Sequence, residues 1–526
     1  MVYACRTTIL RDVIFEVNLL YRLVKYLLYT AFFFIASLPA VTMAMPPILT
    51  TGQLQSGMIG TAETVVQGNE IESFNVRIIG VENNGRKAPK QIMAEAYGPI
   101  INDTNGVIHG MSGSPVYVNG CLIGAISRGI GTDTDPHVFY ITPIEDMLKL
   151  WDLPDPKADN GKLDQVKISM TDKKQRVIQE EKELDKILKK MKPAETGSVS
   201  DALTGNSKDK TDTGAAAAVK KDKAADPAHK MEFVNIDNNW KVNYGSESND
   251  TAKTMDIPIA VDGFGGAGLD YLKKELAPFN MYPYEAGAAS DDSSTDSFVG
   301  SADIRPGSSV GVAISYGDFS VGAVGTVTAL DGNKILAFGH PFTYRGNVNY
   351  FMTDADIVGT ASGLVNGQKV SSLGKIIGRI NQDRYSGVSG IIGQYPSVVP
   401  MKVTVNDRQL DRHNIYATSI AYDEELLPNL AASIAYASLD RTIDSLSSGT
   451  ANVKFEIMTN AVNAGRVVRS NMYYNGDDVG QFAVSELLQM LNIICSDPNE
   501  QYNILGINMD LSFDEKRKTA SIINVI

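Results

Sequence analysis

The sequence holds few of the residues that cross-link small secreted domains or bind transition metals. Its three cysteines, Cys5, Cys121 and Cys495, are far apart, and none belongs to a Cys-x-x-Cys or Cys/His pair. Neither a disulfide framework nor a metal site is therefore expected. Basic residues are also in the minority, since 48 Lys and Arg face 61 Asp and Glu and leave a net charge of -13. A chain this acidic is not expected to bind DNA or RNA.

The chain of 526 residues is longer than one hydrophobic core normally organises. Its apolar share of 43% and its charged share of 21% are typical of globular proteins. Two domains with connecting material are therefore expected.

The N-terminal segment has the pattern of an export signal. Two basic residues precede an apolar run over 26–38, and a small-residue cleavage pattern ends at Ala44. The apolar stretch over 26–44 is also just long enough to remain as a membrane anchor. Residues 1–45 are therefore expected to be a signal peptide or membrane anchor, which exports the mature chain to the cell envelope, the periplasm or the medium.

The next segment, 46–155, shows the alternation of short β-strands. Apolar and polar residues alternate over 71–79, and an Asn-Gly turn at 119–120 splits residues 114–126 into a predicted hairpin. A helix over 143–151 is expected to close this β module. Charged helical spacing follows over 171–191, and residues 193–230 have almost no bulky apolar groups. The stretch 156–230 is therefore predicted to be a charged helix and a flexible linker.

Beyond the linker the β pattern returns. In 231–400, alternation predicts strands over 308–314, 321–329 and 334–338, with Asp-Gly supplying a turn. A C-terminal β-rich subdomain is expected over 401–526, with strands at 452–458 and 504–513 and a helix over 479–494. The glycines of 263–268 fit GxGxxG, but no acidic residue ends a second parallel strand at the required distance. A flexible hinge is expected there, and no cofactor.

The most specific segment is Gly-Met-Ser-Gly-Ser-Pro at 110–115, on the loop before the predicted hairpin. A serine nucleophile needs an exposed hydroxyl on a tight turn, small neighbours, and backbone N–H groups free to stabilise an oxyanion. Ser112 meets the first need, and the N–H groups of Gly110, Met111 and Ser112 are candidates for the oxyanion hole. An ordinary Gly/Ser turn between strands is the alternative interpretation.

Only five histidines are present, and a nucleophilic serine normally needs one as its base. His340 ends a predicted strand, with Gly339 allowing a close approach and Pro341 stiffening the exit. The four others lie in the linker, in loops, or too close to the serine along the chain: His109, His137, His229 and His413. His340 is therefore the predicted base.

Residues 110–129 (GMSGSPVYVNGCLIGAISRG) and 334–342 (KILAFGHPF) resemble the stage IV sporulation protein B serine peptidase family. The resemblance extends to 57–79 and to 325–393. It implies a chymotrypsin-like fold, a double β-barrel built from two chain halves, in which the serine and the histidine of these motifs are catalytic. Carried over to this sequence, those residues are Ser112 and His340.

The sequence departs from the family in three ways. The serine half precedes the histidine half, so the order resembles a circular permutation. The family's acid aligns with Tyr-Gly-Pro at 97–99, where no carboxylate stands, and nearby Asp103 is the possible orienting acid. No PDZ-like segment is evident. Because the acid chiefly holds the histidine tautomer, its loss can lower turnover by up to about four orders of magnitude without abolishing the fold.

The patterns and the resemblance together predict a mainly β protein with a few helices. The predicted function is an exported serine endopeptidase that cleaves protein or peptide substrates by acyl transfer and needs no cofactor. The alternative is a non-catalytic, peptidase-like binding or envelope-scaffold protein, which the missing acid and the long C-terminal region favour.

Overall fold

The computed structural model describes residues 45–82, 89–129, 135–156, 257–286, 304–363, 367–445, 448–496 and 503–517, together with the backbone of 232–235 and 240–243. Contacts divide the chain into two units, Met1–Met45 and Pro46–Ile526. The predicted signal, the charged helix over 171–191 and the linker over 193–230 lie outside the described residues. No helix in the described ranges is long and apolar enough to cross a membrane.

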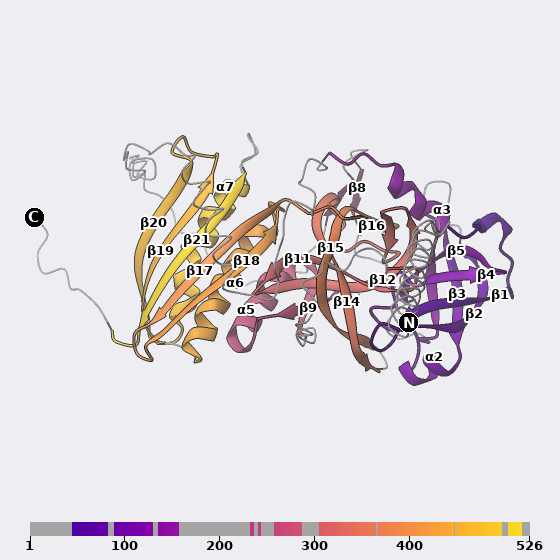
Figure 1. Cartoon of the computed structure of the whole chain (residues 1–526), viewed down its shortest axis with the longest axis horizontal. Coiled ribbons are helices and arrows are strands. Elements are labelled where there is room, and N and C mark those ends of the chain that lie inside the picture. Colours follow the sequence, from indigo (N-terminus) through magenta and orange to yellow (C-terminus); the bar gives the residue numbers. More distant parts are fainter. Residues whose placement is uncertain are drawn as a thin grey trace, which may run out of the picture. The chain divides into compact units, whose positions relative to one another are not determined.

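Six antiparallel strands of the N-terminal half close into a barrel (Figure 1). They are β1 Ile59–Val65, β2 Ile71–Glu82, β3 Gln91–Tyr97, β4 Pro115–Val118, β5 Cys121–Gly129 and β6 Val138–Pro143. The alternation that predicted β2 places Phe74, Val76 and Ile78 in the barrel core, with at most 3% of each exposed. Asn119 and Gly120 form the predicted hairpin turn with positive φ values of 52° and 75°, the combination that a two-residue turn requires.

Short helical segments flank this barrel. They are the 3₁₀ turn η1 Thr51–Gln53, α2 Pro99–Thr104, α3 Ile144–Met147 and the 3₁₀ turn η2 Leu148–Asp152. The last two occupy the residues of the helix predicted over 143–151.

A second barrel lies within a sheet of 13 strands. Its members are β11 Ser309–Gly317, β12 Ser320–Asp331, β13 Lys334–Ala337, β14 Gly346–Ala361, β15 Gln368–Arg384 and β16 Gly387–Ile392. Each pairs antiparallel with the next around the ring β11-β12-β13-β16-β15-β14, and β14 pairs with β11 to close it.

Both barrels have the same strand order. Numbered from its own first strand, each ring runs 1-2-3-6-5-4 and closes between the first and fourth strands. The mainly β class and the pair of barrels expected for a chymotrypsin-like fold are therefore confirmed, with the serine motif in the first barrel and the histidine motif in the second.

The remaining strands extend the second sheet. They are β9 Ile257–Asp262 and β10 Met281–Glu285 beside β12, and β18 Arg412–Ala421, β17 Val398–Asp407, β21 Ile504–Asp514, β19 Gly449–Thr459 and β20 Arg466–Asn475 beyond β11. A short hairpin, β7 Glu232–Asn235 with β8 Trp240–Asn243, is separate. The C-terminal strands therefore continue the sheet of the second barrel.

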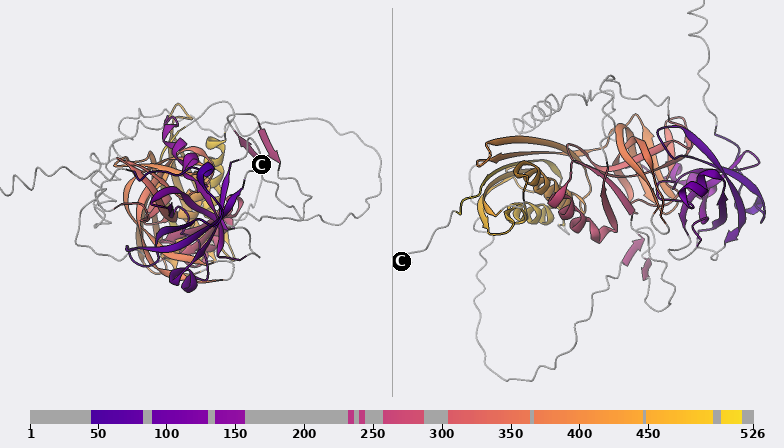
Figure 2. Two further views of the ribbon diagram at one scale, coloured as in Figure 1. Left: turned by 90° about the vertical axis from the view of Figure 1, so that its right-hand side faces the viewer. Right: turned by 90° about the horizontal axis from the view of Figure 1, so that it is seen from below.

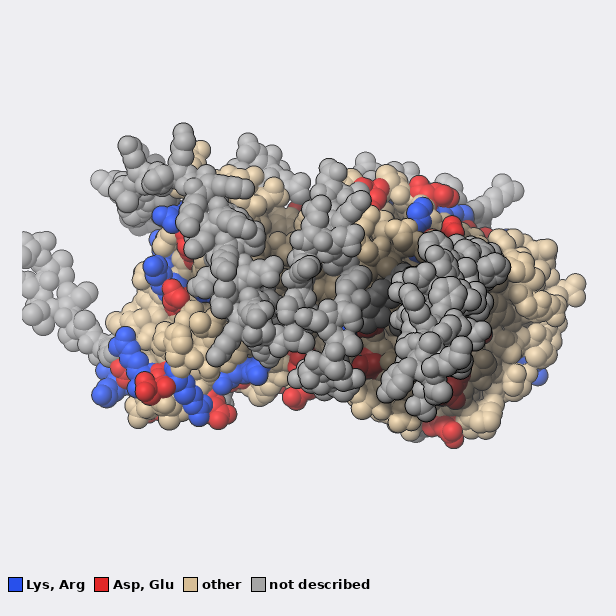
Figure 3. Space-filling view, in the orientation of Figure 1, with Lys and Arg blue, Asp and Glu red and all other residues tan. Residues whose placement is uncertain are grey.

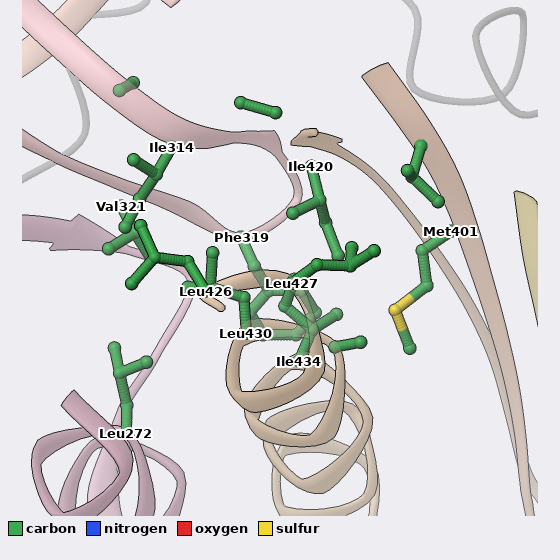
Figure 4. Close-up of a cluster of buried hydrophobic side chains, with 14 of the residues drawn as sticks. Leu272, Ile314, Phe319, Val321, Met401, Ile420, Leu426, Leu427, Leu430 and Ile434 are labelled. Atoms are coloured by element: carbon green, nitrogen blue, oxygen red, sulfur yellow. The ribbon is translucent and has the colours of Figure 1, made fainter. Parts of the chain in front are cut away.

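Three helices pack together against one face of these outer strands, as the right-hand view of Figure 2 shows. They are α5 Gly266–Leu276, which continues into the 3₁₀ turn η5 Ala277–Phe279, then α6 Leu427–Ile443 and α7 Val479–Cys495. In Figure 4, Leu427, Leu430 and Ile434 of α6 pack against Phe319, in the turn between β11 and β12, and Ile420 of β18. The sequence did not predict α6, because it is buried on nearly every side and has no polar face to produce a helical period.

The glycine-rich segment over 263–268 differs from the expected hinge. A side chain at Gly263 would lie 2.0 Å from the backbone oxygen of Asp318. The N–H of Gly268 donates to the carboxylate of Asp440 at 3.0 Å. The segment is therefore a packed entry into α5.

Two basic side chains of β20 form ion pairs with acidic side chains of β19 and α7. Arg466 and Arg469 of β20 form ion pairs with Glu456 and Glu486. Acidic and basic residues accordingly lie side by side at the left of the face shown in Figure 3.

A buried ion pair ties the end of the first barrel unit to the second barrel. The side chain of Arg379, on β15, is 0% exposed and donates to both carboxylate oxygens of Asp155. Gln394 accepts two further hydrogen bonds from the same guanidinium, at 3.2 and 2.9 Å. The chain leaving η2 is thereby held against β15.

Replacing Asp155 with alanine is expected to lower the free energy of unfolding by about 3–5 kcal/mol, because the buried Arg379 would keep its charge without a carboxylate. Chemical denaturation of the purified protein measures this. Asp152→Ala is the matched control, since Asp152 is exposed three residues earlier. Equal stabilities of the two variants would contradict the prediction.

Candidate active site

The serine motif forms a tight turn between α2 and β4. Gly110 and Gly113 have φ values of 90° and 94°, in the left-handed region that glycine favours. Two backbone hydrogen bonds close the turn, from Met111 N–H to Ile108 O at 3.1 Å and from Ser114 N–H to Met111 O at 3.0 Å. The glycines of the motif are therefore required by the backbone.

The turn exposes one of its two serines and buries the other. Ser114 is 0% exposed and its hydroxyl has no hydrogen-bond partner in the described part of the chain. Ser112 keeps part of its surface open, and its hydroxyl donates only a long hydrogen bond of 3.4 Å to Ser127 O. Of the two, only Ser112 presents a hydroxyl that a substrate can reach.

The backbone N–H groups around Ser112 fall into two kinds. The N–H of Met111 is bound to Ile108 O, so this member of the predicted oxyanion hole is occupied. The N–H groups of Gly110 and Ser112 have no acceptor among the described residues. Two such donors, two residues apart at a partly exposed serine, are the arrangement that stabilises an oxyanion.

His340 lies on the segment that follows β13. Phe338 and Gly339 have positive φ values of 70° and 66°, which turn the chain sharply at the end of the strand. The Nδ1 of His340 lies 2.8 Å from Pro341 O. Because a carbonyl only accepts, Nδ1 carries the proton of the neutral ring and Nε2 is left as an acceptor.

The surroundings of His340 keep its ring neutral. Burial, the largest effect, together with the charges of Arg128 and His109 lowers the pKa of His340 to about 4, although the hydrogen bond to Pro341 O raises it. Burial also lowers the pKa of His109. His109, set aside from the sequence for its closeness to Ser112 along the chain, is therefore part of the electrostatic surroundings of His340.

The serine and histidine turns pack against each other through β12. Thr326 N–H donates to Ser112 O at 2.8 Å, and Phe338 N–H donates to Thr326 O at 3.3 Å. A Cβ at Gly113 would lie 2.0 Å from Thr326 O and 2.5 Å from Phe338 N. The turns from the two halves are thus in direct contact.

This contact is reinforced around both turns. Thr142 donates its hydroxyl to Gly339 O at 2.5 Å, and Thr328 donates to Gly113 O at 2.7 Å. No hydrogen bond joins Ser112 to His340 in the described residues. The structure brings the two predicted residues onto adjoining turns, without a direct bond between their side chains.

Asp103 is not part of this arrangement. It is exposed on α2, and within the described ranges it makes no hydrogen bond to His340, whose Nδ1 is taken by Pro341. Two other histidines are paired elsewhere, His137 with Asp135 and His413 with Asn406, and His229 lies outside the described residues.

A carboxylate that the sequence analysis missed holds the histidine segment. Asp383, at the end of β15, is 0% exposed. It accepts hydrogen bonds from the N–H of Phe342 at 2.7 Å and from the N–H and hydroxyl of Thr343 at 2.6 Å each. In the sequence, only its position in the segment 378–384, which lies in the family-like region 325–393, pointed to Asp383 as a functional residue. Its role depends on the pairing of β15 with β14 and β16, which the sequence does not display.

No cluster of three or more His, Cys, Asp or Glu that could hold a metal occurs in the described residues. Residues 40–148 match the family described as SpoIVB peptidase S55. This match covers the first barrel and the serine turn, and it agrees with the family that the sequence resembles. No curated protein and no solved structure matches the chain.

Gly113→Ala is expected to separate the two turns, because the new methyl group would collide with the backbone of β12. We expect the free energy of unfolding to fall by at least about 3 kcal/mol, beyond the roughly 1–2 kcal/mol of left-handed strain alone. Gly57→Ala is the control, since Gly57 has a φ of 86° and open space around it. Similar losses in the two variants, measured by chemical denaturation, would argue against the contact.

The lowered pKa of His340 predicts that its ring stays neutral down to about pH 5 and protonates near pH 4. NMR titration of the histidine ring nitrogens measures this, with His340→Gln assigning the signal. The folded pKa lies below the unfolded value of 6.5, so stability should fall as pH drops from 6.5 toward 4, and less steeply in His340→Gln. A titration midpoint at 6.5 or above would contradict the prediction.

Proposed function

We propose that this chain, whose residues 40–148 match the SpoIVB peptidase S55 family, is an exported serine endopeptidase that uses Ser112 and His340. The observation that carries the proposal is the pair of N–H groups, on Gly110 and Ser112, that have no acceptor among the described residues and lie at the partly exposed Ser112, on a turn that adjoins the turn of a neutral His340. Export is proposed from the signal pattern over 1–45.

The reaction follows from these positions. Nε2 of His340 takes the proton as Ser112 Oγ attacks the carbonyl carbon of the scissile bond. The N–H groups of Gly110 and Ser112 donate to the resulting oxyanion. His340 then gives the proton to the leaving amine. In the second half of the reaction His340 takes a proton from water as the water attacks the acyl group, and it returns that proton to Ser112 Oγ as the acyl group leaves.

A peptide substrate is favoured by an unpaired stretch of β5 near the serine, in which Ser127 is buried and Arg128 and Gly129 are exposed. The pairing of β4 with β5 ends at Pro115 and Ala125, so residues 127–129 of β5 have no strand partner on that side in the described chain. Ser127 O lies next to the Ser112 hydroxyl. An extended peptide can add to such an edge as a further strand.

Because the partner of His340 Nδ1 is the carbonyl oxygen of Pro341, we expect a low rate of peptide cleavage. A carbonyl orients the ring, as the acid of a serine protease triad does, but it carries no full charge to balance the imidazolium formed during attack. Slow turnover is therefore expected. The same observation favours the second candidate function, a non-catalytic peptidase-like binding or scaffold protein.

Labelling with a fluorophosphonate probe separates the two functions and tests the nucleophile. We expect the mature protein to be labelled, and Ser112→Ala to lose both labelling and peptide cleavage while keeping its thermal stability.

Ser114→Ala is the matched control, because it removes a buried hydroxyl that has no partner. It should label like the unmodified protein and be equally or slightly more stable. Absence of labelling in the unmodified protein would favour the scaffold function. Loss of labelling only in Ser114→Ala would identify Ser114 as the nucleophile.

A further inference from the structure

A lysine is buried between the two barrels, directly behind the serine turn. Lys369, the second residue of β15, is 3% exposed. Its ammonium donates to the hydroxyl of Thr64, on β1, at 2.8 Å and to that of Thr326, on β12, at 3.4 Å. No Asp or Glu pairs with it in the described residues, and burial lowers its pKa to about 7.

A buried lysine without a carboxylate partner lowers the stability of the fold. Moving an ammonium group out of water without a carboxylate partner costs several kcal/mol, and an apolar side chain of similar length would fill the same space more cheaply. Buried ionisable residues with strongly shifted pKa values concentrate at functional sites. Lys369 contacts the serine turn, so a role of its charge is to be sought at Ser112.

The backbone of Lys369 orients one donor of the oxyanion hole. Its N–H donates to His109 O at 2.9 Å, while His109 N–H donates to Gly367 O at 2.9 Å. In a trans peptide the C=O and N–H groups point in opposite directions. Holding His109 O toward β15 therefore turns the N–H of Gly110 away from β15.

The side chain of Lys369 reaches the other side of Gly110. Its aliphatic carbons lie 2.9–3.0 Å from the point where a Cβ on Gly110 would stand. Its ammonium donates to Thr326 Oγ1, which in turn donates to Gly110 O at 3.0 Å. Lys369 thus contacts both peptide groups that flank the Gly110 α-carbon, directly or through one hydroxyl.

We infer that Lys369 is a positioning residue that orients the Gly110 peptide of the oxyanion hole and places a positive charge behind it. The inference rests on the proposed function, because the oxyanion forms only if Ser112 attacks a substrate. A positive charge in a buried, low-dielectric position stabilises developing negative charge more than it would in solution, and with a pKa of about 7 Lys369 carries that charge at and below neutral pH. Its effect should appear in the rate of chemistry at Ser112 and not in the stability of the fold.

The test replaces Lys369 with methionine, which keeps the backbone bond and the aliphatic chain but removes the ammonium. The rate of Ser112 labelling by the fluorophosphonate, and kcat for a peptide substrate, should each fall at least about tenfold, with KM little changed. The thermal midpoint should stay the same or rise, because an unpaired buried charge is gone. A purely structural lysine would give the opposite result, a lower midpoint and an unchanged rate per folded molecule.

Two further variants complete the design. Lys454→Met removes an exposed lysine on β19 and should change neither rate nor midpoint. Thr326→Val removes the hydroxyl between Lys369 and Gly110 but keeps the backbone bonds, so it should slow labelling as well. If the hydroxyl relays the effect of the lysine, the double variant should be little slower than the slower single variant.

The outcomes separate the inference from the proposed function. If the unmodified protein is not labelled, the proposed function fails, and the inference fails with it. If the unmodified protein is labelled and Lys369→Met is labelled at the same rate, only the inference is overturned. If Lys369→Met does not fold, Thr326→Val decides, and labelling of that variant at the unmodified rate overturns the inference.

Discussion

The close approach of the serine turn to β12 is the contact on which the rest of the arrangement depends. Gly113 has no side chain, and a methyl group there would lie within 2.0 Å of Thr326 O. The same threonine holds Ser112 O with its N–H and Gly110 O with its hydroxyl. The second barrel therefore shapes the turn of the first. Neither half of the chain contains both the turn and the residues that orient it.

The shared strand order of the barrels explains how two chain halves can form one site in either order. Ser112 lies on the segment between the third and fourth strands of the first barrel, and His340 lies on the corresponding segment of the second. Contacts between the two barrels bring these equivalent segments together. Chain order does not enter this geometry, so the reversed order of the serine and histidine halves is compatible with the arrangement of a serine peptidase.

Three buried charged residues lie where the barrels and their turns meet. Arg379 is paired with Asp155, Asp383 accepts three hydrogen bonds from the segment after His340, and Lys369 has only hydroxyl partners. His340 is held neutral in the same region by burial and by Arg128. Apolar residues would join two barrels at lower cost. The polar groups instead give each turn one defined orientation, which catalysis at a serine requires.

Short motifs and the family resemblance predict Ser112 and His340 as the reactive pair, and those roles stay a prediction. Local patterns in the sequence also determined the β class, the strands β2, β4 and β5 of the first barrel and the Asn119–Gly120 turn, because alternation and turn residues act over a few neighbouring positions. They did not reveal the buried helix α6, the positions of Asp383 and Lys369, or the fact that the Met111 N–H is occupied. Each of these depends on strands far apart in the chain that pair or pack only in the folded protein. Tertiary structure alone decided them, because burial and long-range hydrogen bonding set which polar groups are free to act.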